Sequence, residues 1–561
     1  MPGEVAPGAS GPDVLAAKGE PEQGGAVAPA GPAAGCGERR HGAPRLVNPV
    51  SVLFPDSAQG ARGEGSGPPE FFRDLQLDRV VQAITASREE YDLEPFFYQI
   101  LPDVNAIEYR HEVFRDVEEL GMSQLIGSFA GRFRTMRQYL GRAEKSYYEL
   151  QKARWFLDAV AIYCEAVTSL TEDLRALRLK SRGLVALREY LCAHVGSEAF
   201  TALRSEAVGL LADLDAVTYA LLVKGTRITV RPYQGEADYS AEVAETFRKF
   251  RQGEVKDYTV ALPTWLEMNH VEARVLDFVA ALNTETFSRL RDFLVRHAGY
   301  LDPVIGAFDR EIQWYVACLD YIAGLRPSGL RFCYPRVTRD SKEVCATQCF
   351  DVALAQTLAA WRGTPVCNDF LLAGRERILV VSGPNQGGKS TFARMFGQVH
   401  YLASIGCLVP GRDARLFLFD RMFTHFERTE DIANLRGKLE DDLVRSRRIL
   451  AEATPNSIII MNEIFSSTTL EDARTLGERI LRRIIDLDAL CVYVTFVDDL
   501  SRLAEQTVSV VSTVEPDDPA TRTFRIVRRP SDGAAYAATI AERYGLTYAG
   551  IRDRLRERLT S

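Results

Sequence analysis

The stretch from Arg377 to Thr391, RILVVSGPNQGGKST, constrains the fold of this chain more than any other. Residues Ile378 to Val381 form a continuous apolar run, which predicts a short, buried parallel strand. The run breaks at Gly383 into a glycine-rich turn, and a helix is expected to begin near Lys389. A strand, a glycine-rich turn and a helix in this order predict a phosphate-binding loop (P-loop) inside a parallel α/β domain.

The residue types in this turn suit a nucleotide. Glycines let successive N–H groups point at phosphate oxygens, and the positive end of the following helix adds to the attraction. The Lys389 amine is expected to reach the β- and γ-phosphates, and the Ser390 hydroxyl to ligate Mg²⁺. The alternative is a chance pattern, against which the flanking strand and helix count. The predicted nucleotide-binding residues are Gly383, Pro384, Asn385, Gln386, Gly387, Gly388, Lys389, Ser390 and Thr391, with ATP and Mg²⁺ as the cofactors.

A second buried strand is predicted at Ser457–Met461 and ends in Asn462 and Glu463. In P-loop ATPases the strand beside the loop delivers an acidic pair, in which the first residue orients Mg²⁺ and its waters and the second positions the attacking water. Glu463 fits the second role and, with Lys389, is the catalytic candidate. Asn462 stands where Asp is expected and can hold Mg²⁺ only through a bound water. A structural strand-end carboxylate is the alternative for Glu463.

The chain has 561 residues, too many for one hydrophobic core. Residues 1–68 are rich in Gly, Ala and Pro and are expected to be a disordered tail. Residues 69–336 are expected to form a region of long helices, and alternating strand and helix patterns predict an α/β domain over residues 337–561. No apolar run is long enough to cross a bilayer and no signal peptide is found, so a cytoplasmic protein without membrane contact is expected.

The helical region contains two basic features. Apolar residues in steps of three and four run from Leu125 to Tyr147 and predict one stripe of a long helix, with Arg134, Arg137, Arg142 and Lys145 off that stripe. In Lys224–Pro232 a period of two predicts a strand, with Ile228 and Val230 on one face and Arg227, Thr229 and Arg231 on the other. Arg227 and Arg231 are candidate DNA contacts; an ordinary exposed strand is the alternative. The arm arginines favour a solvated helix flank over a phosphate-tracking face.

Several motifs together resemble the MutS mismatch-repair family. They are GPNQGGKST at Gly383–Thr391, LASIGCLVPGRDARLFLFDRMFTHF at Leu402–Phe426, Asn368-Asp369 before the P-loop strand, and TFRIVRRPSDGAAYAATIAERYGL at Thr523–Leu546. The resemblance covers about residues 337–555 and implies an ABC-like ATPase domain. The helical region is similar to that family's core and lever, with the strand segment near 224–232 at its DNA clamp. The family's N-terminal mismatch-reading domain has no counterpart in this sequence.

Three positions depart from the family pattern. Gly437 stands where the family has Ser in the loop that completes the partner subunit's site, Phe496 follows Thr495 where the family has His, and Asn462 replaces Asp. Each departure removes a polar or charged contact to Mg²⁺ or the γ-phosphate, and the loss of one such contact commonly lowers a rate by about 10²-fold. We therefore expect slow ATP hydrolysis, or a nucleotide-gated switch with little turnover.

The resemblance implies a homodimer in which each P-loop is closed by the Gly437 segment of the other copy. ATP would then move the helical arms around DNA, in mismatch repair or a related repair or recombination process, with other repair proteins as partners and a nucleoid location. The net charge of −8 supports an alternative, a nucleotide-binding scaffold that does not bind DNA. A chromosome-structuring ABC-like ATPase is a further alternative, but it predicts a long coiled coil that the helical region does not show.

Overall fold

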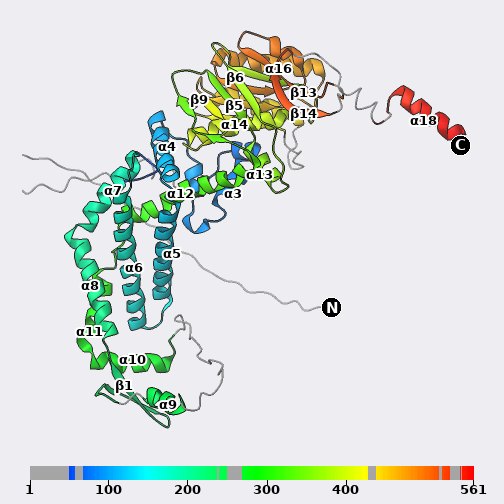
Figure 1. The fold of residues 1–561 in the computed structure, drawn as a ribbon. Helices are drawn as coiled ribbons and strands as arrows, with labels where there is room; N and C mark the ends of the chain where they lie inside the picture. The colour runs from blue at the N-terminus through cyan, green and yellow to red at the C-terminus, as the bar shows by residue number, and fades with distance from the viewer. Residues whose placement is uncertain are drawn as a thin grey trace, which may run out of the picture. The chain divides into compact units, whose positions relative to one another are not determined.

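The computed structural model describes residues 50–56, 67–236, 239–248, 268–427, 437–516, 518, 521–530, 544 and 546–560. These residues build a part made of helices and a part made of sheets and helices (Figure 1). None of the helices among them is long and apolar enough to span a bilayer.

A six-stranded sheet carries the glycine-rich stretch, in the strand order β10–β11–β12–β7–β13–β14. Its members are β7 (Ile378–Ser382), β10 (Met422–Phe426), β11 (Ile458–Asn462), β12 (Leu490–Val494), β13 (Thr507–Val514) and β14 (Arg522–Arg528). Neighbouring strands are parallel except β14, which is antiparallel to β13. Strands β7, β11 and β12 are buried along their whole length, which explains their unbroken apolar sequences. The prediction of a mixed fold with a parallel sheet is confirmed.

Helices cover both faces of this sheet because side chains alternate along each strand. Leu379 and Val381 of β7 belong to a core that includes α14 (Lys389–Ser404), whereas Ile378 and Val380 belong to a second core. That second core includes the apolar stripe of α16 (Leu470–Leu487) and Ile449 of α15 (Lys438–Glu452). The helix after the glycine-rich turn is therefore held between the sheet and the rest of the molecule.

Smaller sheets lie beside the main one. A four-stranded sheet has the order β4–β9–β5–β6, and β3 pairs with β8. Their bounds are β3 (Phe332–Cys333), β4 (Arg336–Thr338), β5 (Val344–Cys349), β6 (Asn368–Leu372), β8 (Val409–Pro410) and β9 (Asp413–Phe417), with α13 (Val352–Ala359) between β5 and β6.

The helical part consists mainly of long antiparallel helices. They are α4 (Val104–Glu119), α5 (Ser123–Lys145), α6 (Glu149–Ala176), α7 (Arg182–Val195), α8 (Glu198–Asp215), α10 (His270–Leu282), α11 (Thr284–Arg296) and α12 (Pro303–Leu325). The apolar stripe predicted from Leu125 is confirmed in α5, where Phe129, Phe133 and Met136 are buried. Tyr147 is an error in that prediction, because it lies beyond the end of α5 and is 90% exposed.

The strand predicted at Lys224–Pro232 is one half of a hairpin. Strand β1 (Tyr219–Lys224) pairs antiparallel with β2 (Arg227–Pro232), and Gly225, at φ 61°, lies in the two-residue turn. The predicted strand is therefore wrong at its start, and β1 was missed. The alternation is confirmed: Ile228 and Val230 lie opposite Val223 and Leu221, on the face away from the arginines. Helix α9 (Tyr239–Arg248) follows the hairpin.

The expectation of a disordered tail up to residue 68 is wrong for residues 51–54. Val52, Leu53 and Phe54 are 1%, 0% and 6% exposed and belong to the main core. This short segment packs into the core although the surrounding sequence is rich in Gly and Pro. The rest of the expected tail up to residue 49, and residues 57–66, lie outside the described residues.

The next described elements connect the N-terminal region to the sheet. They are α2 (Phe71–Leu75) and α3 (Leu77–Thr85). The rings of Phe71 and Phe72 pack edge-on against Tyr401 of α14, with centroids 5.2 and 5.1 Å away. The Asp74 carboxylate lies 2.8 Å from the Arg445 guanidinium of α15. Residues far apart in sequence thus share one core.

Candidate functional site

The carboxyl ends of three parallel strands meet at one edge of the main sheet. Strand β7 leads there into the glycine-rich turn, β11 ends at Asn462, and β12 leads into Thr495 and Phe496. Backbone hydrogen bonds fix the register, since Glu463 N donates to Val494 O and Thr495 N to Val381 O, each at 3.0 Å. Ligands of open α/β sheets bind at this edge.

Backbone conformation at two positions and a close approach at a third require glycine in the turn. Gly383 and Gly388 have φ of 115° and 90°, a region that side chains disfavour. A Cβ at Gly387 would lie 2.2 Å from Ser512 Oγ of β13, and that hydroxyl donates to Gly387 O at 2.6 Å. Gly388 is the N-cap of α14 and has no side chain to cap the first-turn amides, so they face the turn.

The Lys389 amine lies in the centre of this turn. The side chain is 3% exposed, and Nζ donates to Gly383 O at 2.9 Å and to Asn385 Oδ1 at 3.1 Å. It also lies 3.2 Å from Glu463 Oε1, so the structure brings the two catalytic candidates together. A buried amine needs such partners, because an unpaired buried charge is strongly unfavourable.

The residues after β11 adopt an uncommon backbone conformation. Glu463 and Phe465 have φ of 51° and 62°, although neither is glycine. Such conformations persist only where the surroundings hold them, and they are frequent at functional sites. This turn aims the Glu463 carboxylate at Lys389. Asn462, 7% exposed, has its Oδ1 buried without a hydrogen-bond partner among the described residues.

A buried polar network, which the sequence did not reveal, holds that turn in place. Asp442 of α15 accepts a hydrogen bond from Phe465 N at 3.2 Å and one from His425 Nε2 of β10 at 2.9 Å. His425 Nδ1 lies 3.4 Å from Ser446 Oγ. Because a carboxylate only accepts, Nε2 carries the proton and Nδ1 faces the hydroxyl. The Asp442 position in an acidic run, KLEDDL, gave no local signal of burial.

Gly437 precedes α15 and is its N-cap, five residues before Asp442. It is exposed, and a Cβ there would meet nothing within 4 Å, so the absence of the family's Ser has no steric cause among the described residues. The expected partner-site loop spans Thr429–Leu443, and its part before Gly437 lies outside the described residues. Phe496, the other departure at this edge, is 42% exposed, whereas Thr495 is buried.

Asn368 and Asp369 have structural roles near the turn. Asn368 Oδ1 accepts from Ile526 N at 2.7 Å and Nδ2 donates to Phe524 O at 3.1 Å, which fixes β14 beside β6. Phe524 in turn lies 3.7 Å from where a Gly388 Cβ would be. Asp369 accepts from Gln348 N of β5 at 2.6 Å. The second half of the motif at Thr523–Leu546 falls mostly on residues 531–543, outside the described residues.

The residues at this edge fit a Mg²⁺–nucleotide. The first-turn amides of α14 and the Lys389 amine are donors for phosphate oxygens, and Ser390 is half-buried beside them. The unpartnered Asn462 Oδ1 fits a water held by a hard cation, which prefers oxygen ligands. No cluster of three or more His, Cys, Asp or Glu in the described part of the chain is arranged to hold a metal by itself. Such a cation would therefore take its ligands from phosphate, water and the Ser390 hydroxyl.

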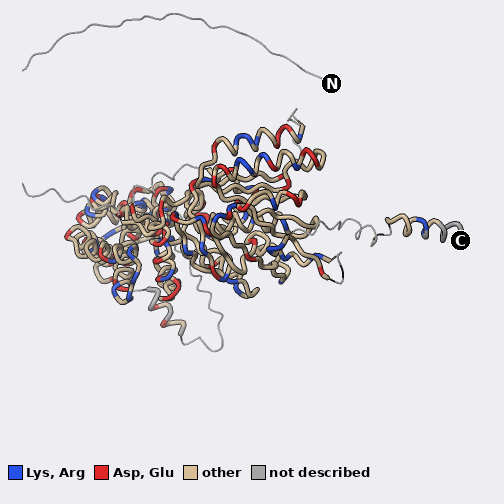
Figure 2. The backbone as a smooth tube through the Cα atoms, turned by 90° about the horizontal axis from the view of Figure 1, so that it is seen from above, with Lys and Arg blue, Asp and Glu red and all other residues tan. Residues whose placement is uncertain are grey.

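The candidate DNA contacts lie elsewhere, in the β1–β2 hairpin. Arg227 is exposed, while Arg231 forms an ion pair of 2.8 Å with Glu236. The arm arginines are engaged within the molecule: Arg134 pairs with Glu90, and Arg137 pairs with Glu90 and Asp309. These ion pairs count against a phosphate-tracking face formed by Arg134 and Arg137. In Figure 2 basic and acidic residues are interspersed over both parts.

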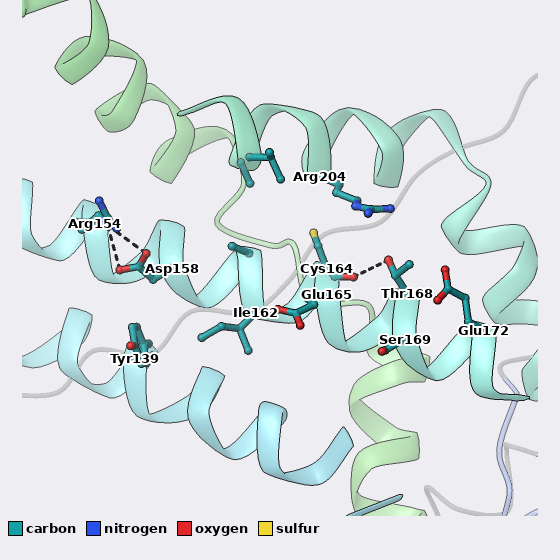
Figure 3. A pocket seen from close by; sticks show the side chains of 13 residues that line it. Tyr139, Arg154, Asp158, Ile162, Cys164, Glu165, Thr168, Ser169, Glu172 and Arg204 are labelled. Atoms are coloured by element: carbon teal, nitrogen blue, oxygen red, sulfur yellow. Dashed lines mark hydrogen bonds and ion pairs between the residues drawn. The ribbon is translucent and has the colours of Figure 1, made fainter. Parts of the chain in front are cut away.

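Two cavities lie away from the glycine-rich turn. One of about 660 Å³ lies on α6 between α5 and α8, where Arg154 pairs with Asp158 and Thr168 donates to Cys164 O (Figure 3). Glu165, which lines this cavity, lies 3.6 Å from Arg132. The charged side chains around the cavity are therefore largely paired with opposite charges. The other, of about 780 Å³, is lined by β5, β6, β13 and β14 and includes Asn368. It lies beside the strand that borders Gly388.

Fold and site together define the class of protein: an α/β domain whose central parallel strand enters a glycine-rich turn and a helix, joined to a long-helix region. Residues 379–549 match the family model of MutS domain V. Relatives named DNA mismatch repair protein MutS are 32% identical over 190 residues in Shouchella clausii and 31% over 189 residues in Halalkalibacterium halodurans, each covering 33% of this chain and 22% of the relative. A third, from Exiguobacterium sp., is 33% identical over 150 residues, 27% of this chain and 18% of the relative. The C-terminal part of the chain is therefore similar to MutS proteins. It spans about a fifth of the length of these relatives.

Proposed function

We propose that this chain is a MutS-type ATP-binding protein that dimerises, binds DNA and hydrolyses ATP slowly, in DNA mismatch repair or a related repair process. The observation that carries the proposal is the meeting of Lys389 and Glu463 at 3.2 Å, where the glycine-rich turn and the end of β11 share one sheet edge. The names of the relatives support the process at the level of the family.

In this proposal each residue has a defined task. Lys389 exchanges its carbonyl partners and Glu463 for phosphate oxygens, a charge-assisted contact that is stronger than a neutral one. Glu463 is thereby released to orient a water molecule, and Asn462 would hold Mg²⁺ through water. Magnesium ion supplies positive charge to the phosphates when it is bound. The ABC-like arrangement, and closure of the site by the Gly437 segment of a second copy, belong to the same proposal.

Hydrolysis is expected to be slow because three groups that would stabilise the reaction are replaced. Asn462 brings no charge, Gly437 no hydroxyl and Phe496 no imidazole to the site. Removal of one such contact commonly costs about 10²-fold in rate. Nucleotide binding can nevertheless shift the arms, by as much as its affinity differs between the two arm positions.

Nucleotide binding is the direct test. Lys389→Ala should weaken binding of a fluorescent ATP analogue with Mg²⁺ by about tenfold or more, because a charge-assisted hydrogen bond is worth roughly 1.5–3 kcal/mol. Arg482→Ala, on the exposed side of α16, is the matched control and should bind as the wild type does. Sedimentation of both variants with and without ATP reports association. Equal nucleotide affinity and equal association state of Lys389→Ala and wild type would refute the proposal.

A second candidate function is a nucleotide-binding scaffold that does not touch DNA. The ion pair of Arg231 with Glu236 and the internal pairing of Arg134 and Arg137 favour it, since these cations are already neutralised. Nucleotide affinity would be the same for both candidates. Only binding to duplex DNA separates them.

A further inference from the structure

The buried segment Ser51–Phe54, here called the strap, is held almost entirely by side chains. It belongs to no helix or strand, yet the carbonyls of its first three residues accept hydrogen bonds from side chains. Ser51 O accepts from Tyr109 at 2.5 Å, Val52 O from Tyr315 at 2.6 Å, and Leu53 O from Arg110 Nε at 3.1 Å. Tyr109 and Arg110 come from α4, and Tyr315 from α12.

One carboxylate receives the donors of the strap. Glu311 of α12 accepts from Ser51 Oγ at 2.9 Å, from Val52 N at 2.8 Å and from Leu53 N at 3.3 Å. Ser51 Oγ itself accepts from Phe54 N at 3.0 Å. The strap backbone therefore lies between a buried cation, Arg110 at 1% exposed, and a buried anion, Glu311 at 8%.

The apolar side chains of the strap complete the fit. Val52 and Leu53 are fully covered, and the Phe54 ring lies 5.0 Å from the Arg110 guanidinium, which also lies over Trp314 at 4.8 Å. The backbone of the strap bends at Val52 and Leu53 and is bound by polar side chains, while its apolar side chains are buried. Backbone hydrogen bonds combined with pockets for side chains are also how proteins recognise short peptides. Ser51 is the only strap residue whose side chain makes a polar contact among the described residues, so it sets the register.

Burial of the charged side chains that bind the strap would be energetically unfavourable if the strap were absent. Arg110 and Glu311 would lose partners in an apolar interior, and a buried charge without partners is strongly destabilising. Arg110 also donates to Ile405 O at 2.7 Å, the residue after α14. When the strap is bound, these side chains therefore connect α4 and α12 to α14, the helix that begins at the glycine-rich turn.

We propose that Tyr109, Arg110, Glu311 and Tyr315 form a peptide-binding site whose tethered ligand is the strap, and that a free peptide of the same sequence can replace a defective strap. The ligand is a Ser–apolar–apolar–aromatic peptide that bends at its two central residues. The tether gives the strap a high local concentration, so the wild-type site excludes free peptide.

The test uses the full chain with Leu53→Asp, which places a charge in an apolar pocket, and a labelled peptide of residues 48–56. Fluorescence anisotropy should show that this peptide binds the variant at least about tenfold more tightly than it binds the wild type, since 1.4 kcal/mol is tenfold. Thermal unfolding of the variant should rise towards that of the wild type when the peptide is added. The same peptide carrying the Leu53→Asp change is the control and should do neither.

Full-length Ser51→Ala provides a second variant that keeps the apolar contacts, should Leu53→Asp fail to fold. It removes the hydroxyl on Glu311 and should bind the wild-type peptide more tightly than the wild-type chain does. Equal binding of peptide to wild type and Ser51→Ala, or rescue by the control peptide, would overturn the proposal. Unchanged unfolding of both folded variants with excess peptide would overturn it too.

Discussion

Gly387 is the position in the glycine-rich turn where an added side chain would make the closest contact. Because a Cβ at this position would lie 2.2 Å from Ser512 Oγ, Gly387→Ala should destabilise the protein by roughly 1–3 kcal/mol and weaken nucleotide binding. Ser512→Ala removes the clashing hydroxyl, so the double variant should recover part of the loss. Urea unfolding of the single and double variants measures this coupling.

Gly131 in α5 is the control for that substitution. Nothing lies within 4 Å of its Cβ position, so Gly131→Ala should be neutral or stabilise by up to about 1 kcal/mol. If Gly387→Ala is as stable as Gly131→Ala, the close approach to Ser512 is not a constraint.

His400 makes the stability of α14 depend on pH. The ring is buried between Phe396 and Phe370, Nδ1 lies 2.9 Å from Phe396 O, and burial lowers the pKa of His400 to about 4. A His whose pKa falls on folding takes up a proton more readily when unfolded. Stability is therefore present above the unfolded pKa of 6.5 and is lost as pH falls towards 4.

His400→Phe should remove up to about 3 kcal/mol of that acid sensitivity, since one pKa unit corresponds to about 1.36 kcal/mol. Burial also lowers the pKa of His111 to about 4, so part of the slope should remain in the variant. Urea unfolding between pH 4 and 7 measures the difference. His270→Gln, exposed at the start of α10, serves as control. If the unfolding free energies of the wild type and His400→Phe change with pH in the same way, His400 is not a source of the acid sensitivity.

At the scale of elements, α15 connects the Gly437 position to the turn that carries Glu463. Asp442 of this helix accepts hydrogen bonds from Phe465 N and His425. Arg445 of the same helix forms an ion pair with Asp74 of α2. A displacement at the start of this helix would therefore be felt at the catalytic candidate and at the N-terminal region.

Asp442→Ala leaves two buried donors without an acceptor, and each such group costs about 1–3 kcal/mol. We expect a loss of roughly 2–4 kcal/mol in unfolding free energy, together with a lower kcat for ATP at little changed KM, because Glu463 loses its support. Asp441→Ala, exposed next to it on α15, should change neither by more than about 0.5 kcal/mol. Asp442→Asn retains an acceptor for Phe465 N and should restore part of kcat. Equal kcat for the Asp441 and Asp442 variants would show that the network does not position Glu463.

At the scale of the whole molecule, the open question is whether the arms carry DNA. When a protein neutralises DNA phosphates, the logarithm of its binding constant falls linearly with the logarithm of the salt concentration, with a slope of about −0.9 per phosphate. If Arg227 contacts the backbone, Arg227→Ala should weaken duplex binding at low salt and reduce that slope by about one. Arg482→Ala on the sheet part is the control. Absence of binding by wild type at low salt would favour the scaffold.

The local sequence was sufficient for the elements that carry the site. The strand at Ile378, the glycine-rich turn, the helix from Lys389 and the alternation in β2 follow from residue order, because strand and helix periods and glycine conformations act over a few positions. The strand predicted at Ser457–Met461, with the general pattern of P-loop ATPases, also placed Glu463 near the turn, and the parallel sheet confirms their proximity. The roles of these residues in binding remain proposals.

Other features depended on contacts between residues far apart in sequence. The sequence near residue 51 does not show that Glu311 and Arg110 form hydrogen bonds with the backbone of this segment. The sequence near Asp442 does not show that its carboxylate accepts a hydrogen bond from Phe465 N. Such contacts join positions up to some hundreds of residues apart, and only the packing of complete elements brings them together. The sequence by itself therefore determined the local motif and its chemistry, while the tertiary structure decided which buried charges hold it and which segment joins the arms to the sheet, because burial is a property of the assembled core.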